Sequence, residues 1–211
     1  MIVINFKSYK VGKEVVDLVR TIEIHCNKAV IAVPSVYLKD IVKETSLDVY
    51  AQHVDFIEKG KGTGFVIPES LVDSGVKGSL LNHAEHQISM SNIKKTIERC
   101  NTLRLKLVVC VDSIEKAEKI KKLKPYGIAF EDPKLIGTGK SVTSYDANDI
   151  KKFVKILEGS NIIPLCGAGI SSGEDVKAAL SMGCKGVLVS SIIANSQNPE
   201  KFLKEVGQYI K

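Results

Sequence analysis

Apolar residues form short, nearly continuous runs along this chain, many of them rich in valine and isoleucine. Such runs are typical of strands that are buried on both faces, as in a parallel sheet covered by helices. The runs are residues 2–4, 30–33, 49–51, 79–81, 107–109, 128–130, 162–166 and 187–189. The sequence therefore predicts eight buried strands.

Between the runs, apolar residues recur every three or four positions, which is the spacing of a helix with one buried face. The stripes are Val15, Leu18, Val19 and Ile22; Ile150, Phe153, Val154 and Leu157; Val176, Ala179 and Leu180; and Phe202, Leu203, Val206 and Ile210. Two helix starts are predicted from capping pairs, Asp112 with Glu115 and Ser172 with Asp175. Strands and helices thus alternate along the chain.

This alternation fits either a closed barrel or an open doubly wound sheet. A G-x-G-x-x-G turn after the first strand would favour the open sheet, but Asn5, Phe6 and Lys7 stand there instead. We therefore predict an α/β fold, a (β/α)8 TIM barrel of eight parallel strands. The 211 residues are fewer than the roughly 250 typical of this barrel, so some outer helices must be short. Residues 1–211 are expected to form one domain, with residues 60–64 as a loop.

Composition narrows the function classes. The formal net charge is +6, but the basic residues are dispersed and only 6% of residues are aromatic, whereas nucleic-acid-binding proteins usually cluster their basic groups. Lys119, Lys121, Lys122 and Lys124 are expected on the solvated face of one helix. The positive surplus suits an anionic small molecule. No stretch approaches the roughly 18 apolar residues of a membrane span.

The cysteines and the N-terminal segment predict a cytoplasmic protein. An apolar strand precedes the basic residues Lys7 and Lys10, which is the reverse of a secretory signal. The five cysteines are scattered without C-x-x-C spacing, so we expect reduced core residues rather than disulfides or a zinc site.

Polar residues capable of chemistry follow the predicted strands. They are Asn5 and Lys7, Gln52 and His53, Asn82, His83 and Glu85, Glu131, Gly167 to Gly169, and Ser190 with Ser191. In a closed barrel these strand ends meet on one face, where enzymes of this fold keep their active sites. We therefore predict a site assembled from several strands.

Two of these segments indicate particular roles. Glu131 leads into Pro133 and a Gly-Thr-Gly sequence at residues 137–139, which suits a carboxylate on a hinged lid, although an ordinary loop would read similarly. Small residues after the seventh and eighth strands allow backbone N–H groups to approach a phosphate. Phosphate sites at these two positions recur in this barrel class.

A metal site is not favoured. His83 could equally be a structural histidine, and the nearby Glu85 and His86 leave only His53 as a third imidazole. The sequence also lacks the H-E-x-x-H spacing of helical zinc sites. No cofactor is predicted.

Taken together, the motifs resemble the triosephosphate isomerase family, in particular its short archaeal branch. They comprise residues 5–7, 51–53, 62–64, 82–85, 131–139, 167–170 and 186–191, in order along the chain. The resemblance implies interconversion of dihydroxyacetone phosphate and glyceraldehyde 3-phosphate. It implies that Glu131 is the base, that His83 is the neutral electrophile, and that Lys7 stabilises the enediolate charge.

The resemblance also implies the binding groups. Asn5 and Phe6 would help position the substrate, and the backbone N–H groups of Ile136, Gly169, Ser190 and Ser191 would bind the phosphate. Glu85 would order Lys7, with Gln52 in support. Thr63 would lie on a loop that reaches into a neighbouring subunit's site, in a homotetramer built as a dimer of dimers.

Three features depart from the common family pattern. Asp132 stands where most relatives have proline, although Pro133 remains. The chain has no Trp, and the region between the fourth and sixth strands is short, which is expected to remove helical cover. Two alternatives stay open from the residues alone: another phosphate-binding barrel, such as an epimerase or biosynthetic isomerase, and a non-catalytic barrel that binds sugar phosphates.

Overall fold

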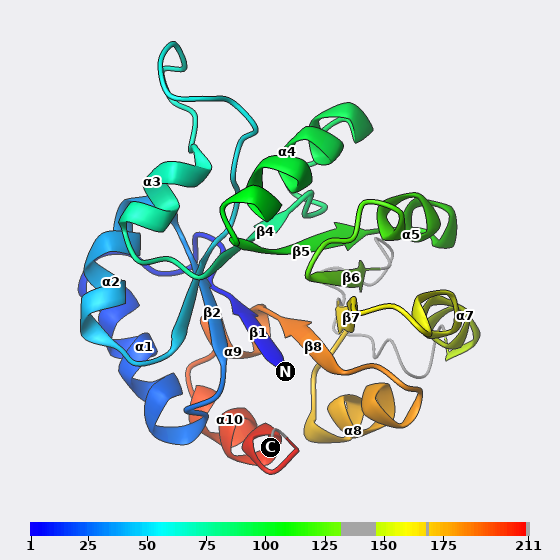
Figure 1. Cartoon of the computed structure of the whole chain (residues 1–211). Coiled ribbons are helices and arrows are strands. Elements are labelled where there is room, and N and C mark those ends of the chain that lie inside the picture. Colours follow the sequence, from blue (N-terminus) through cyan, green and yellow to red (C-terminus); the bar gives the residue numbers. More distant parts are fainter. Residues whose placement is uncertain (132–146, 168, 210–211) are drawn as a thin grey trace.

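A closed barrel of parallel strands forms the centre of the molecule. The structure is a computed structural model that describes residues 1–131, 147–167 and 169–209. The strands pair in chain order, and β8 pairs with β1 to close the ring (Figure 1). They are β1 (Ile2–Asn5), β2 (Val30–Val33), β3 (Asp48–Ala51), β4 (Gly78–Leu81), β5 (Lys106–Val111), β6 (Gly127–Glu131), β7 (Ile163–Gly167) and β8 (Gly186–Val189). The predicted barrel is confirmed, and the open sheet is excluded.

Helices surround the barrel in Figure 1. They are α1 (Lys13–His25), the 3-10 turn η1 (Ser35–Tyr37), α2 (Leu38–Glu44), α3 (Pro68–Asp73), α4 (Met90–Thr102), α5 (Ile114–Lys121), α7 (Ala147–Leu157), α8 (Gly173–Ser181), α9 (Ser191–Ala194) and α10 (Pro199–Gly207). The expectation of short helices holds for α2, α3 and α5, which have 7, 6 and 8 residues. Between β4 and β6, however, α4 has 13 residues. In that region, therefore, only α5 is short, and α4 covers the barrel with a helix of ordinary length.

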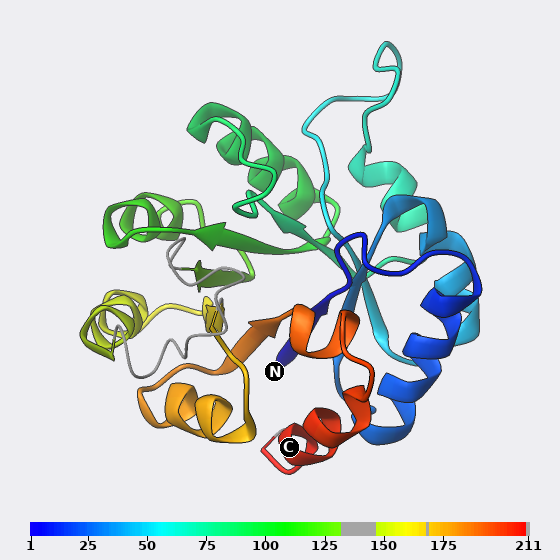
Figure 2. The same ribbon diagram turned by 180° about the vertical axis from the view of Figure 1, so that it is seen from behind.

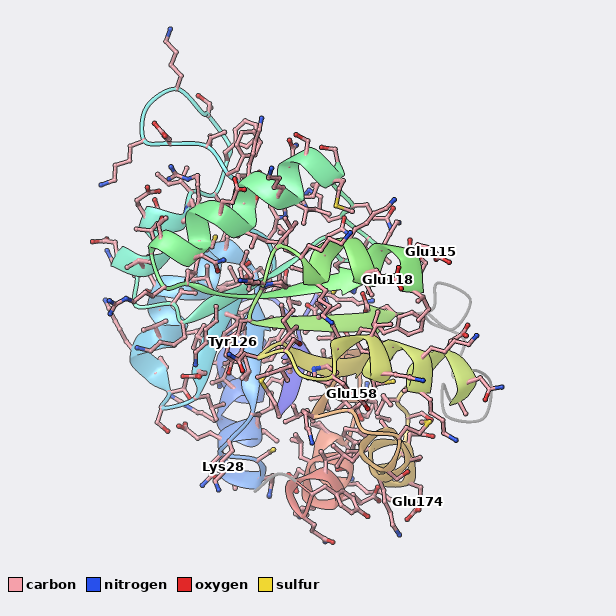
Figure 3. The ribbon with its side chains drawn as sticks, turned by 45° about the vertical axis from the view of Figure 1, so that its right-hand side comes forward. Lys28, Glu115, Glu118, Tyr126, Glu158 and Glu174 are labelled. Carbon is pink, nitrogen blue, oxygen red and sulfur yellow. The ribbon has the colours of Figure 1, made fainter. Side chains whose placement is uncertain are left out.

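The predicted apolar stripes pack against the barrel. All four stripe residues of α1 are buried, whereas Val154 of α7 and Leu180 of α8 are only partly buried. Ile210 lies outside the described residues. Charged side chains cover the outer surface of these helices, for example Glu118 on α5 and Glu174 on α8 (Figure 3).

Both predicted helix starts are confirmed, but one of the two capping residues differs from the prediction. The Ser172 hydroxyl caps α8 by accepting a hydrogen bond from the Asp175 N–H at 3.2 Å. Helix α5 is capped by Ser113 instead of Asp112, because Ser113 has extended backbone and its hydroxyl accepts from the Lys116 N–H. The Asp112 carboxylate instead forms an ion pair with the Lys116 amine at 2.6 Å.

The lysine run was placed only partly correctly. Helix α5 ends at Lys121, so Lys122 and Lys124 follow it rather than lying along it. Lys119, Lys122 and Lys124 are exposed. The Lys121 amine differs, since it donates a hydrogen bond to the backbone oxygen of Ile156 at 2.6 Å.

Side chains fill the interior of the barrel. Val3, Leu80, Val108, Ala129 and Leu165 are among the buried residues of an inner cluster. Their strand neighbours, such as Ile2 and Ile4, belong to a second cluster that packs against the helices. Both faces of the strands are therefore buried, as the apolar runs predicted, and polar groups emerge only where the strands end.

One segment extends away from this compact frame. Residues 55–66, called here the protruding loop, lie between β3 and α3 and reach well beyond the ring of helices (Figures 1 and 2). Its neck is closed by two hydrogen bonds, from the Asp55 N–H to the Val66 oxygen at 2.7 Å and from the Val66 N–H to the Asp55 carboxylate at 2.8 Å. None of the described helices is long and apolar enough to cross a membrane.

Candidate active site

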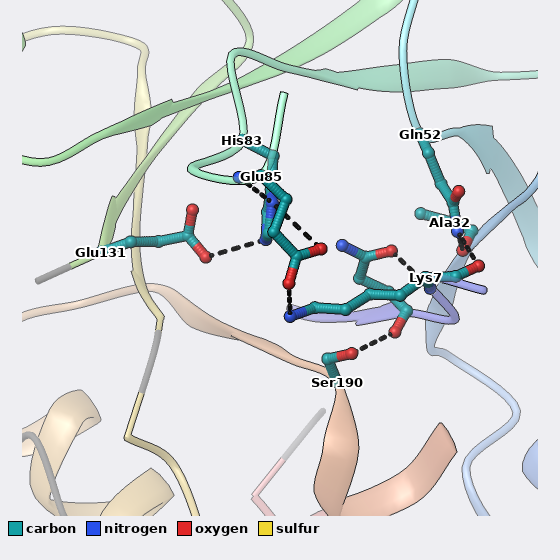
Figure 4. Close-up of polar contacts among 8 residues, drawn as sticks. Lys7, Ala32, Gln52, His83, Glu85, Glu131 and Ser190 are labelled. Carbon is teal, nitrogen blue, oxygen red and sulfur yellow. Dashed lines mark hydrogen bonds and ion pairs between the residues drawn. The ribbon is translucent and has the colours of Figure 1, made fainter. Parts of the chain in front are cut away.

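The predicted site residues meet at the carboxyl-terminal end of the barrel. Figure 4 shows Lys7, Gln52, His83, Glu85, Glu131 and Ser190 arranged around one centre, although they come from segments far apart in the sequence. This face is where the strand ends of a (β/α)8 barrel converge. The geometry of each group follows from the strand end that holds it.

Lys7 follows β1 and has a left-handed backbone conformation, which is rare for residues other than glycine. Its φ is 46°, and such left-handed conformations cost about 1–3 kcal/mol. Two side chains hold it there. The Asn5 side-chain oxygen accepts from the Lys7 N–H at 2.9 Å, and the Gln52 amide donates to the Lys7 oxygen at 2.9 Å. Asn5 and Gln52, both predicted as site residues, thus fix the start of the Lys7 side chain.

Phe6 packs in the core and fixes the segment that carries Lys7. Its ring is buried and its N–H donates to the Ala32 oxygen at 2.9 Å. Gln52 donates to the same oxygen at 3.3 Å. Phe6 therefore anchors the segment in the core, and its ring does not face the open site.

The Lys7 ammonium extends across the site to the turn that carries His83. Its Nζ lies 2.7 Å from a carboxylate oxygen of Glu85. The Lys7 side chain is 17% exposed and that of Glu85 is 55% exposed. Since exposed ion pairs add little stability, the main effect of this pair is to hold the cation in place.

The hydrogen bonds of His83 define its tautomer. Its Nδ1 accepts a hydrogen bond from the Glu85 N–H at 3.1 Å, so Nδ1 carries no proton. The ring is then neutral, and Nε2 carries the proton. This Nε2 lies 3.5 Å from a carboxylate oxygen of Glu131. The neutral imidazole thus directs its N–H toward the site.

Glu131 is the last residue of β6 rather than the first residue after it. Its side chain is only 6% exposed. The other carboxylate oxygen accepts no hydrogen bond from an N–H or O–H group within the described residues. The fully buried Cys110 lies beside this carboxylate, and burial, followed by the Glu131 charge, raises the pKa of the Cys110 thiol well above its ordinary value. The Cys110 thiol also forms a hydrogen bond with the Glu131 carboxylate.

The residues predicted to bind the substrate phosphate follow β7 and β8. Gly169 has a φ of 74°, which favours glycine. Ser190 is joined to the strand 1 end, because its hydroxyl donates to the Asn5 oxygen at 2.7 Å. Ser191 begins helix α9, and the first N–H groups of a helix have no partner within it. These amides can therefore receive an anion.

The start of α8 is different. The Asp175 carboxylate accepts from the Ser171 N–H at 2.9 Å and from the hydroxyls of Ser171 and Ser172 at 2.9 and 3.0 Å. The aspartate of this helix therefore occupies these donors itself. Ile136, Asp132, Pro133 and the Gly-Thr-Gly sequence lie outside the described residues.

An open cavity of about 780 Å³ lies beside these groups. Its lining includes Lys7, Gln52, His83 and Glu85, together with the two ends of the protruding loop. Glu131 is not part of this lining and lies on the other side of His83. The cavity therefore joins Lys7 and His83 to the loop that carries Thr63, which is itself exposed.

The histidines do not gather around a common centre for a metal. Within the residues that the structure describes, no three His, Cys, Asp or Glu side chains are placed to hold a metal ion. His53 contacts Asp55 at 3.2 Å, and its ring stacks on that of His86.

The profile of the triosephosphate isomerase family matches residues 1–206. The chain belongs to the triosephosphate isomerase family. It is 36% identical to triosephosphate isomerase of Methanocaldococcus jannaschii over the whole of both chains. It is also 36% identical to that of Sulfolobus acidocaldarius, over 97% of this chain and 92% of the relative, and 35% identical to that of Archaeoglobus fulgidus, over 98% and 96%. The resemblance to an archaeal isomerase is confirmed.

The sequence placed Asn82 among the polar residues at the strand ends but indicated no role for it in the site. Asn82 has a φ of 58° and is buried. Its amide donates to the Cys110 oxygen at 2.9 Å, and its oxygen accepts from the Ile88 N–H at 3.0 Å. Asn82 thereby fixes the segment that carries His83. The available signal was an asparagine at a strand end, since asparagine tolerates this conformation better than most residues.

Proposed function

We propose that this protein interconverts dihydroxyacetone phosphate and glyceraldehyde 3-phosphate. The observation that carries the proposal is the 3.5 Å separation of His83 Nε2 and the Glu131 carboxylate. A base and a proton donor at this separation can act on neighbouring atoms of one small substrate. The family membership of the whole chain supports the same reaction.

The proposed reaction begins with Glu131. Its carboxylate takes a proton from the carbon beside the substrate carbonyl, and the electron pair of that C–H bond forms the double bond of an enediolate. His83 donates its Nε2 proton to the carbonyl oxygen and recovers a proton from the neighbouring hydroxyl. Glu131 then returns its proton to the other carbon, so that no group is consumed. This division between a glutamate and a neutral histidine is the established one for the family.

Lys7 meets the negative charge that develops in this step. A fixed cation in a partly dry site stabilises an oxyanion without reorganising during the reaction. Glu85 holds the ammonium at 2.7 Å, while Asn5 and Gln52 hold its backbone. Glu85 and Gln52 are thus proposed as supporting residues, and Asn5 as a group that also positions the substrate.

The phosphate of the substrate is proposed to bind the backbone N–H groups of Gly169, Ser190 and Ser191. The positive φ of Gly169 and the helix start at Ser191 support this assignment. Ile136 is proposed as a fourth amide, on the lid that follows Glu131. We propose no metal and no cofactor, since the steps above need only proton transfers.

We also propose that the protein acts as a homotetramer, a dimer of dimers, in which the protruding loop with Thr63 enters a neighbouring subunit's cavity. The support lies in exposed apolar groups on these surfaces: Phe65 on the loop is 55% exposed, Val11 65% and Val36 78%. Residues 1–211 are proposed to form one domain within this assembly.

A cytosolic location is proposed from the cysteines. All five are buried and unpaired, which suits a reducing compartment. Burial raises the pKa of Cys100 to about 12, so its thiol is inert toward oxidation at neutral pH.

A direct assay tests the proposed reaction. Purified protein is mixed with glyceraldehyde 3-phosphate and with a coupling dehydrogenase that reduces dihydroxyacetone phosphate with NADH. The loss of NADH absorbance then measures the formation of dihydroxyacetone phosphate. The proposal predicts rapid, metal-independent turnover that persists in EDTA. Binding of the substrate without turnover would instead identify a sugar-phosphate-binding barrel.

A further inference from the structure

Two imidazole rings are stacked at the edge of the candidate site. The rings of His53 and His86 have centroids 4.1 Å apart and an interplanar angle of 22°. Both side chains line the same cavity as Lys7 and His83. The mechanism proposed above uses neither ring, so the pair needs another explanation.

Each ring belongs to a different part of the site. His53 follows β3, and its Nε2 lies 3.2 Å from Asp55, which closes the neck of the protruding loop through its bonds to Val66. His86 ends a turn of residues 83–86, in which its N–H donates to the His83 oxygen at 2.8 Å. The stack therefore joins the neck of the loop to the turn that carries His83.

Asn82 attaches this turn to β5 through the Cys110 oxygen. On the other side of the turn, Glu85 and His86 are both exposed, and Glu85 contacts the ammonium of Lys7. The same turn supplies the Glu85 N–H that selects the His83 tautomer. A change in the shape of the turn that moved the Glu85 N–H away from His83 would lengthen that hydrogen bond and release the ring. The aromatic stack is thus placed to limit this movement.

We propose that His86 is a positioning residue for His83, acting through its stack on His53. The inference rests on the proposed role of His83 as the proton donor. It assigns to His53 and His86 a mechanical link between the protruding loop and the catalytic turn, and it makes that link sensitive to protonation.

The electrostatic surroundings give the sign of the pH dependence. Burial lowers the pKa of His53, the hydrogen bond with Asp55 opposes this shift, and His86 adds to the lowering. The other titratable or charged groups that line the cavity are Lys7, Tyr9, Asp55, His83 and Glu85. Two imidazolium rings at this separation repel each other. Protonation of both rings therefore weakens the stack.

Two substitutions separate stacking from titration. His86→Phe keeps a flat ring for the stack but cannot be protonated, whereas His86→Ala removes the ring. Stacked aromatic pairs contribute about 0.5–1.5 kcal/mol, so the full loss of positioning corresponds to a decrease in kcat of about two- to thirteenfold. We expect this decrease for His86→Ala, with KM nearly unchanged, and near-normal kcat for His86→Phe at neutral pH.

The pH profiles should also differ. Interconversion is followed directly by NMR between pH 5 and 8, which avoids a pH-sensitive coupling enzyme. His86→Phe is expected to retain a larger fraction of its neutral-pH kcat at pH 5.5 than the unaltered protein. Equal activity of all three proteins at every pH would overturn the inference, as would equal impairment of the two variants.

A second readout does not depend on turnover. Long-range ¹H–¹⁵N spectra report which ring nitrogen of His83 is protonated, and only His86→Ala should lose the single Nε2–H tautomer. An unchanged His83 spectrum in that variant would overturn the inference even in an inactive protein. Lack of turnover by the unaltered protein would instead refute the proposed reaction. Recovery of His86→Ala activity at higher protein concentration would show an effect on self-association and would also overturn the positioning role.

Discussion

Gln52→Leu tests how the site holds Lys7. The Gln52 amide donates to two backbone oxygens, that of Lys7 at 2.9 Å and that of Ala32 at 3.3 Å. Leucine keeps a side chain of similar size but has no donor. The substitution therefore leaves both carbonyls without this partner, and it frees one side of a backbone whose φ is 46°.

The expected magnitude follows from these contacts. Each hydrogen bond contributes about 1 kcal/mol net, so the free energy of unfolding should fall by about 2 kcal/mol. Relaxation of the strained Lys7 backbone, about 1–3 kcal/mol, would offset part of that loss. The kinetic loss should be larger, because a shift of about 1 Å in a catalytic group can cost about 100-fold in rate.

Urea unfolding and steady-state kinetics measure the two effects separately. We expect kcat/KM to fall by about 10- to 100-fold, with a loss of stability no greater than about 2 kcal/mol. Gln208→Leu, at an exposed glutamine after α10, is the matched control and should change neither. A Gln52→Leu protein with normal kcat/KM would refute the argument that Gln52 positions Lys7.

Three further predictions follow from other parts of the molecule. Lys7→Ala should lower kcat and also weaken binding of a phosphoglycolate-type inhibitor; a change in stability alone would make Lys7 structural. Phe65→Asp should dissociate the assembly in light-scattering measurements and lower kcat, whereas Val72→Asp, at an exposed valine on α3, should do neither. Because folding lowers the pKa of His53, its contribution to stability is complete above its ordinary pKa and is lost as the pH falls toward the folded value; thermal unfolding of His53→Gln should therefore depend less on pH between 7 and 5, and an unchanged dependence would contradict this assignment.

The apolar pattern was sufficient to predict the barrel, because strands buried on both faces leave nearly continuous runs in the sequence. It also placed Glu131 and His83 at strand ends, where closure of the barrel brings them to 3.5 Å. The cap of α5 was predicted one residue early, since aspartate and serine are both good caps and only the backbone decides between them. The choice of Ser113 depends on its extended conformation.

Other features of the site depend on three-dimensional packing. Nothing in the sequence pairs His53 with His86, because they lie 33 positions apart on different strand ends. The same holds for the aspartate that occupies the start of α8, since Asp175 could be read equally as an ordinary member of a capping pair. Asn82 and Lys7 adopt positive φ values that only their hydrogen-bond partners explain.

The central claim is that the buried Glu131 carboxylate is the base that moves the proton. Glu131→Gln keeps the shape of the side chain and removes its ability to accept a proton. Measurement of kcat together with the affinity for 2-phosphoglycolate tests the claim most directly. The account predicts a fall in kcat of at least about 100-fold while the variant still binds the inhibitor. Turnover near that of the unaltered protein would contradict it.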